Sequence, residues 1–242
     1  MTLFSKKTKK TSEKSPVCSA VIAAAGSSAR MKGEDKLFIE IDGMPVLAHT
    51  LKAFQSCELI DEIVVVVRDD QIERVGKLCQ SFGIEKATKI MKGGGARSES
   101  VLFGLLAVSK KAKLVAIHDG ARPCVDAGII ARTIKAAAVT HAAAPAIRVS
   151  STIKRVKDNI VIETVDRENL FEIQTPQVFE ANLIKAALTN AVNKKIDVTD
   201  DCMALELVGA RVHLTMGSRA NIKITTSEDI TIAGVFLGEN KL

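Results

Sequence analysis

A short apolar segment near the start of the chain leads into a loop of small residues that is followed by two cations. The segment Ser19–Ala24 precedes Ala25 and Gly26, and Arg30 and Lys36 come next. Small side chains let backbone N–H groups approach an anion closely, and glycine adopts dihedral angles closed to other residues. A strand and a glycine turn alone are typical of an ordinary βα connection. The arginine and lysine downstream instead favour a polyphosphate site, although the loop lacks the Gly-Lys-Ser/Thr ending of a P-loop and the spaced glycines of a dinucleotide fingerprint.

Two later loops carry residues that suit the same chemistry. The glycines at 93–95 lead into an expected helix, whose N-terminus favours an anion or a polar base edge, although a flexible turn is the alternative. Asp119 directly follows the expected strand Leu114–His118. A carboxylate there is placed to meet a metal-bound phosphate or a sugar hydroxyl, but it could equally cap the next helix or pair with Arg122. His118 itself is expected to pack or to form a hydrogen bond rather than to act as a base.

A lysine interrupts an apolar segment close to the C-terminus. Lys223 lies within Asn221–Ile224, which we expect to form a strand. Desolvating an ammonium group is costly unless an anion is its partner. We therefore expect Lys223 to face an anion, and the alternative is an edge position from which the side chain reaches solvent.

The catalytic motifs that the sequence lacks narrow the choice of reaction. It contains no G-x-S-x-G elbow, no cysteine–histidine cluster and no zinc motif. The loops share cations, small residues and one or two carboxylates, which is what phosphoryl or nucleotidyl transfer requires. An acceptor that is itself a phosphate monoester is mostly ionised at neutral pH, since its second pKa is about 6. Such an acceptor needs no general base.

The elements that position these loops alternate along the chain. Apolar runs predict strands at 17–24, 62–67, 114–118 and 142–147, and amphipathic segments predict helices at 45–54, 71–81, 98–108 and 126–140. This rhythm indicates an α/β fold with a doubly wound, mostly parallel sheet. Ligands of such sheets bind beyond the carboxyl ends of the strands, where the loops described above lie.

The alternation changes after residue 150. Segments 151–156 and 160–165 predict two strands around a turn at Asp158 and Asn159. Such a hairpin, within an arm of about residues 150–178, is expected to grip another subunit or to cover a site. Helices are then expected at 181–193 and 200–208, a strand at 211–216, and a last helix from Thr226 or Ser227, where Thr226–Asp229 resembles a capping box.

Composition and charge exclude several classes of function. Five lysines and one glutamate give the first 16 residues a net charge of +4 out of +6 for the whole chain, so residues 1–16 are expected to be a disordered basic tail and 17–242 a single domain. Aromatic residues make up 3% of the chain, which disfavours nucleic-acid binding. No apolar run is long enough to span a membrane. The five scattered cysteines suit reduced core residues of a cytoplasmic protein.

Eight motifs in order resemble the 2-C-methyl-D-erythritol 4-phosphate cytidylyltransferases of the non-mevalonate isoprenoid pathway. They lie at 23–31 with Lys36, 93–100, 118–123, 152–156, 164–167, 175–177, 199–201 and 221–223. The resemblance implies a Rossmann-like nucleotidyltransferase fold that joins CTP to methylerythritol phosphate and releases pyrophosphate. It also implies Mg²⁺ held mainly by the CTP phosphates, with no protein metal ligand assigned, and a homodimer formed through the arm.

The resemblance assigns roles to individual residues. It implies that Arg30, Lys36 and Lys223 stabilise the reacting phosphates, and that Arg167 and Thr152 hold the acceptor phosphate across the homodimer interface. The positions implied to bind substrate are Ala24, Ala25, Gly26, Gly94, Ser100, Asp119, Arg122, Thr152, Thr175 and Thr199. Of these, Asp119 is expected near the sugar and the metal-bound phosphates.

Two other functions remain open at this point. Ser28, Leu37 and Ser151 depart from the usual residues of the family. The first alternative is a cytidylyltransferase that uses ribitol 5-phosphate or another pentitol phosphate. The second is a nucleotide-binding protein without turnover, which would bind CTP but form no product.

Overall fold

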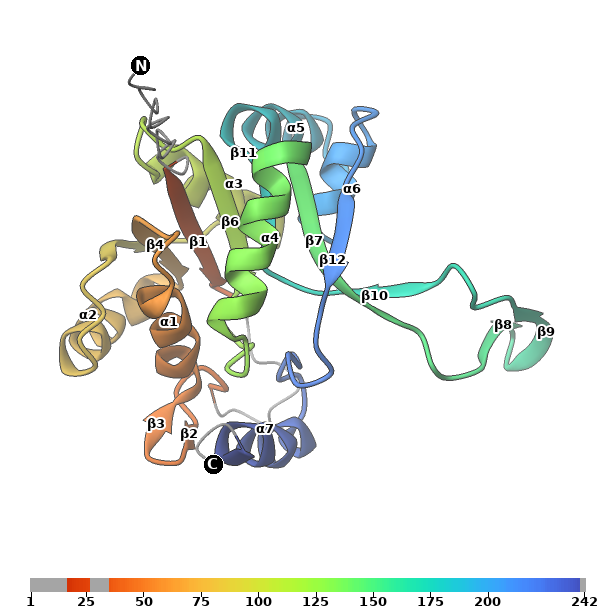
Figure 1. Ribbon diagram of the computed structural model, residues 1–242, viewed down its shortest axis with the longest axis horizontal. Coiled ribbons are helices and arrows are strands. Elements are labelled where there is room, and N and C mark those ends of the chain that lie inside the picture. Colours follow the sequence, from red (N-terminus) through yellow and green to blue (C-terminus); the bar gives the residue numbers. More distant parts are fainter. Residues whose placement is uncertain (1–16, 27–34, 240–242) are drawn as a thin grey trace, which may run out of the picture.

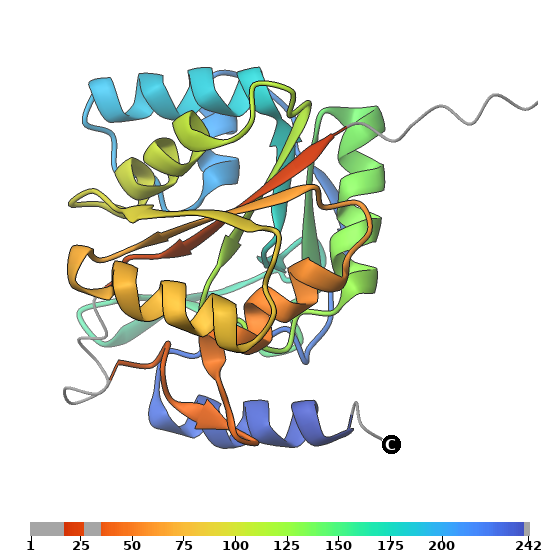
Figure 2. The same cartoon turned by 90° about the vertical axis from the view of Figure 1, so that its left-hand side faces the viewer.

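The computed structural model describes residues 17–26 and 35–239, and these build one central sheet with helices on both faces (Figures 1 and 2). The sheet order is β10-β7-β11-β6-β1-β4-β5, and β12 also pairs with β7. The strands of the sheet are β1 (Cys18–Ala24), β4 (Glu62–Val67), β5 (Ala87–Lys92), β6 (Leu114–Asp119), β7 (Ala142–Arg148), β10 (Phe171–Ile173), β11 (Gln177–Glu180) and β12 (His213–Met216).

The strand directions confirm the mostly parallel α/β sheet. β1 runs parallel to both β4 and β6, β4 runs parallel to β5, and β12 runs parallel to β7. β11, which the sequence did not predict, lies antiparallel between β6 and β7. The carboxyl ends of β1 and β6 therefore lie side by side at one edge of the sheet.

Two helical layers explain why the central strands are continuously apolar. One face carries α1 (Val46–Ser56), α2 (Ile72–Ser81) and α4 (Ala127–Thr140), and the other carries α3 (Arg97–Ala107), α5 (Ala181–Asn193) and α6 (Asp201–Glu206) (Figure 2). Along β1, Ile22 packs in the first layer and Val21 in the second, and neither is exposed. A strand covered on both faces has no position at which a polar side chain reaches water.

A glycine brings α3 unusually close to the sheet. A Cβ at Gly104 would come within 2.5 Å of Val21 Cγ1 and 2.9 Å of Val66 Cγ2. Any larger residue would push the helix outward. This contact fixes α3 against β1 and β4, and thereby fixes the position of its N-terminus beside the end of β1.

The predicted hairpin is present and projects from the body of the molecule (Figure 1). It consists of β8 (Ile153–Lys157) and β9 (Ile160–Val165), which pair only with each other in the described sheets. Asp158 and Asn159 connect them with positive φ angles of 49° and 62°, as a two-residue hairpin turn requires. We call residues 150–178 the arm.

The C-terminal region differs from the sequence-based expectation in one respect. Residues 221–224 form no strand, so the prediction of a strand around Lys223 was wrong. Individual contacts hold this segment instead, since the Asn221 side chain donates to the Thr175 carbonyl and the Ile224 N–H donates to the Ala121 carbonyl. The short hairpin β2 (Glu40–Ile41) and β3 (Met44–Pro45) packs near the last helix, α7 (Ser227–Glu239).

Further expectations concern the start of the last helix, the cysteines, membrane spans and the N-terminal tail. Asp229 accepts the Thr226 N–H, which confirms the carboxylate half of the predicted capping box. All five cysteines are free and buried. No helix in 17–26 or 35–239 is long and apolar enough to cross a membrane. The predicted basic tail, residues 1–16, lies outside the described residues.

Candidate active site

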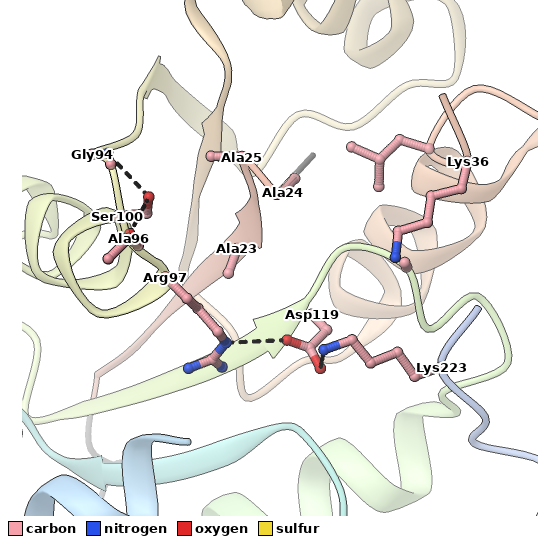
Figure 3. Close-up of a pocket in the computed structure, with 14 residues that line it drawn as sticks. Ala23, Ala24, Ala25, Lys36, Gly94, Ala96, Arg97, Ser100, Asp119 and Lys223 are labelled. Carbon is pink, nitrogen blue, oxygen red and sulfur yellow. Dashed lines mark hydrogen bonds and ion pairs between the residues drawn. The ribbon is translucent and has the colours of Figure 1, made fainter. Parts of the chain in front are cut away.

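A cavity of about 410 Å³ opens where the ends of β1 and β6 meet the N-terminus of α3. Fourteen of the described residues line it, and they come from the three loops that the sequence singled out together with residue 223 (Figure 3). The predicted site residues among them are Ala24, Ala25, Gly26, Lys36, Gly94, Ser100, Asp119 and Lys223. The fold therefore brings together residues that lie up to 199 positions apart in the chain.

Glycines allow the loops around the cavity to approach one another. A Cβ at Gly120 would lie 2.9 Å from the Ala24 Cβ, and one at Gly93 would lie 2.6 Å from both the Ala25 Cβ and Ser100 Oγ. Real Cβ atoms essentially never come so close. The small residues at the end of β1 thus have a packing role as well as leaving room for a ligand.

The glycine loop is held in place by side chains of the helix that follows it. Ser100 Oγ accepts the Gly94 N–H at 3.0 Å and donates to the Ala96 carbonyl at 3.0 Å. Glu99 Oε2 accepts the N–H groups of Gly95 and Ala96 at 2.8 and 3.3 Å. These bonds fix the backbone of the loop before any ligand arrives, which reduces the entropy lost on binding.

Asp119 lies at the centre of a cluster of cations (Figure 3). Lys223 Nζ lies 3.1 Å and Arg122 Nε 3.3 Å from Asp119 Oδ2, and Arg97 Nε lies 3.5 Å from Oδ1. Burial opposes the charged carboxylate, but Arg97, Lys223 and Arg122 outweigh it and hold the pKa of Asp119 below its usual range. Because Arg97 is also paired with Asp201, these three cations and two carboxylates carry a net charge of +1, which favours an anion in the cavity.

Lys36 brings a further ammonium group to the same cavity. Its Nζ donates to the Ile224 carbonyl at 2.9 Å, which ties the loop after β1 to the segment that carries Lys223. Figure 3 shows Lys36, Arg97 and Lys223 approaching from different sides of the cavity. Arg30, which the sequence predicts to be catalytic, lies outside the described residues.

Two predicted substrate-binding residues lie behind Asp119 and do not line the cavity. Arg122 bonds Asp119 and also donates from Nη1 to the Asn221 carbonyl at 2.8 Å. Thr175 Oγ1 accepts the Asp119 N–H at 3.2 Å and lies 2.9 Å from Nδ1 of His118. Both residues therefore contact Asp119 without lining the cavity.

His118 is packed and hydrogen-bonded, as expected from the sequence. Burial lowers its pKa to about 3, so the ring is neutral at physiological pH. A neutral ring can accept the Thr175 hydroxyl hydrogen at Nδ1 while Thr175 accepts the Asp119 N–H. The ring also lies against Phe54, with centroids 4.9 Å apart.

Three predicted residues lie away from the cavity. Arg167 and Thr152 belong to the exposed arm, where Arg167 Nη1 donates to the Ser150 carbonyl. Thr199 is exposed, and its hydroxyl contacts Met203 Sδ at 3.7 Å. None of the three lines the cavity of this chain.

Sequence reasoning missed Arg97, the first residue of α3. Arg97 lines the cavity, approaches Asp119, and is bonded through both terminal nitrogens to Asp201. Burial would lower the pKa of Arg97, but Asp201 and Asp119 raise it above its ordinary value. The available signal was its place two residues after Gly95 and immediately before the helix expected at 98–108.

The residues present would suit a magnesium ion that is bound mainly by its substrate. In the described ranges, no group of three or more His, Cys, Asp or Glu residues is arranged to hold a metal. Asp119 is the carboxylate among the described residues that line the cavity. One carboxylate together with substrate phosphates is a usual Mg²⁺ environment.

Comparisons with known proteins place nearly the whole described chain in one family. A model of the family described as IspD, 2-C-methyl-D-erythritol 4-phosphate cytidylyltransferase, matches residues 18–239. The protein of that name from Halalkalibacterium halodurans is 45% identical over 224 residues, which cover 92% of this chain and 98% of the relative. The one from Caldanaerobacter subterraneus is 45% identical over 222 residues, covering 90% and 98%.

Solved structures give the same result. The crystal structure of 4-diphosphocytidyl-2C-methyl-D-erythritol synthase from Anaerococcus prevotii has a TM-score of 0.82 at 32% identity, covering 93% of this chain and 97% of that one. The Thermus thermophilus 2-C-methyl-D-erythritol 4-phosphate cytidylyltransferase has a TM-score of 0.77 at 30% identity, covering 90% and 98%. The sequence and fold comparisons agree, and the chain belongs to the 2-C-methyl-D-erythritol 4-phosphate cytidylyltransferase family.

Proposed function

We propose that this protein transfers the cytidylyl group of CTP to 2-C-methyl-D-erythritol 4-phosphate and releases pyrophosphate. Family membership supports the reaction and both substrates. The observation that carries the proposal is the convergence of Lys36, Arg97 and Lys223 on one cavity beside the glycine loop. A nucleoside triphosphate brings about four negative charges, and these cations would offset part of that charge.

The chemistry is an in-line displacement at the α-phosphorus of CTP. An oxygen of the acceptor phosphate attacks that phosphorus and forms the new P–O bond. The bond from the α-phosphorus to the bridging oxygen breaks, and its electron pair leaves with pyrophosphate. Because a phosphate monoester with a second pKa of about 6 is already ionised, no side chain has to remove a proton.

The side chains would act mainly through position and charge. We assign Lys223 and Lys36 to the reacting phosphates, with Arg30 as a third cation on the strength of the family resemblance. Charge builds on the phosphate oxygens as the leaving group departs, so a fixed ammonium group stabilises the transition state more than bound CTP. Lys223 is already held 3.1 Å from Asp119 and needs little reorganisation.

The glycine loop and the end of β1 suit the nucleoside. Ser100 and Gly94 lie on one side of the cavity, and Ala24, Ala25 and Gly26 line it at the end of β1. We propose that backbone groups of these loops read the cytosine. We also propose a magnesium ion, held by the CTP phosphates and approached by Asp119, which would neutralise phosphate charge when bound.

The acceptor side of the site is proposed to need a second copy of the chain. Arg167 and Thr152 do not line the cavity of their own chain. The arm also exposes Val156, Ile160 and Ile162, with 52%, 70% and 57% of their surface accessible. We propose that these side chains pack in a homodimer, in which Arg167 and Thr152 hold the acceptor phosphate.

The cysteines bear on the location of the protein. They are free and buried, which suits a reducing compartment, and we propose a cytoplasmic location.

A pyrophosphate-release assay with CTP and separate acceptors tests the function. We expect turnover with methylerythritol phosphate and little or none with ribitol 5-phosphate. The opposite preference would replace our acceptor with a pentitol phosphate. CTP binding without product from either acceptor would indicate the non-catalytic alternative.

A further inference from the structure

A buried carboxylate outside the cavity is bonded to both terminal nitrogens of Arg97. Asp201 is the first residue of α6, and its side chain has no exposed surface. Its Oδ1 and Oδ2 accept hydrogen bonds from Nη1 and Nη2 of Arg97 at 3.0 and 2.8 Å. Asp201 does not line the cavity, whereas Arg97 does. The guanidinium group of Arg97 is therefore the direct contact between Asp201 and the cavity.

The carboxylate is itself fixed to the central sheet. The N–H groups of Asp201 and Cys202 donate to Gln177 Oε1 at 3.0 and 3.1 Å. Gln177 begins β11 and pairs with Ile117 of β6, the strand that ends at Asp119. A continuous series of bonds thus links β6 to Asp201 and Arg97.

We propose that Asp201 is a positioning residue that keeps the forked nitrogens of Arg97 away from Asp119. With both terminal nitrogens on Asp201, only Nε of Arg97 approaches Asp119, at 3.5 Å. Without Asp201, the fork would pair with Asp119 and compete with Lys223 for that carboxylate. Arg97 would lose its place beside the glycine loop, and Asp119 would no longer be available to the bound nucleotide. This inference rests on the proposed CTP site.

The test is CTP binding by titration calorimetry, with steady-state kinetics alongside. Asp201→Asn is expected to weaken CTP binding about tenfold and to raise the KM for CTP similarly, while kcat and the KM for the acceptor stay within about threefold. Asp126→Ala is the control. Asp126 caps α4 through the Ile129 N–H at 2.7 Å, away from the bonds that join Gln177, Asp201 and Arg97, so its loss should lower the melting temperature and leave CTP affinity unchanged.

A double-mutant cycle separates positioning from a general structural effect. If Asp201 acts through Arg97, the Arg97→Gln/Asp201→Asn protein should bind CTP as weakly as Arg97→Gln alone. Should Asp201→Asn fail to fold, Arg97→Lys keeps the charge, removes the fork, and should show the same tenfold loss. Additive losses in the double mutant, or full affinity in either single variant, would overturn the inference. Calorimetry does not depend on turnover, so a wrong acceptor assignment would leave this test intact.

Discussion

The cavity and the arm differ in whether their side chains find partners within the same chain. Around the cavity, charged groups are paired within the chain. For example, Arg97, Arg122 and Lys223 all approach Asp119. On the arm, two strands expose apolar side chains, and the arginine predicted to bind substrate contacts a carbonyl of the arm itself. A single chain therefore arranges the cations we assign to the nucleotide, but leaves the proposed acceptor-binding residues away from them.

The difference has an energetic basis. The glycine loop of the cavity has its N–H groups bonded within the chain, since Ser100 accepts from Gly94 and Glu99 accepts from Gly95. A two-stranded hairpin alone is at best marginally stable in water, and its exposed apolar residues would gain from burial. The predictions below test the two regions separately.

Replacing Lys223 should have the largest effect, because it removes a cation that we assign to the reacting phosphates. We expect Lys223→Ala to lower kcat about 10²–10³-fold while the KM for CTP changes much less, since the charge acts mainly in the transition state. Steady-state kinetics measure both constants. Lys135→Ala, at an exposed position on α4, is the control. An unchanged kcat in Lys223→Ala would dismiss the catalytic role.

Changing Arg167 tests the arm without altering its charge. Arg167→Lys should raise the KM for the acceptor about tenfold and leave the KM for CTP unchanged, because lysine cannot grip a phosphate with two parallel bonds. Arg155→Lys, another exposed arginine of the arm, should be neutral. If only the affinity for CTP changed, Arg167 would belong to the nucleotide site and the contrast between the regions would fail.

Removing the Ser100 hydroxyl should loosen the glycine loop. Ser100→Ala leaves the Gly94 N–H without its side-chain acceptor, a loss of about 1 kcal/mol, which is roughly fivefold in the KM for CTP. Ser98→Ala on the same helix is the matched control. Equal KM values for the two variants would show that this bond does not order the loop for CTP.

Acid should lower the free energy of unfolding through His118. We expect this change to have the smallest effect on activity near neutral pH. Burial lowers the folded-state pKa of His118 to about 3, from an ordinary value of 6.5. Between these values the unfolded chain binds a proton that the folded chain does not, so stability falls as the pH decreases from about 6.5 toward 3. Urea unfolding at several pH values should show a shallower pH dependence for His118→Asn than for the wild type.

The control for this experiment is His141→Asn. His141 is exposed and has a φ of 67°, a conformation that asparagine tolerates well. This variant removes an exposed imidazole, so a change of slope seen only in His118→Asn reports on the buried ring. A His118→Asn protein with the same slope as the wild type would show that His118 does not couple folding to pH in this range.

The strands and turns that could be predicted from the sequence are those marked by their own residues. Strands β1, β4 and β6 are runs of buried aliphatic residues, and the arm's turn is marked by Asp158 and Asn159. β11 was missed because its four residues acquire strand structure from β6 and β7, which lie on either side of it. The strand around Lys223 was wrong because contacts from Thr175 and Ala121 hold that segment without a ladder partner.

The site was predictable where a loop follows a strand and not where a partner is distant. Asp119 and Lys36 are recognisable from their positions after apolar runs. Arg97 was missed because an arginine at a helix start resembles an ordinary surface charge. Its partner Asp201 lies 104 positions away, and nothing in the local sequence indicates that this carboxylate is fully buried.

The most direct test of the account is complementation between two inactive variants. Lys223→Ala and Arg167→Ala chains, co-expressed with different tags and purified as a mixed dimer, would contain one site with both side chains intact. If the arm acts on the partner's cavity, the mixed dimer should show about half the wild-type rate per dimer, while each variant alone stays nearly inactive. A mixed dimer as inactive as its parents would contradict the claim that a second copy supplies the acceptor-binding arginine.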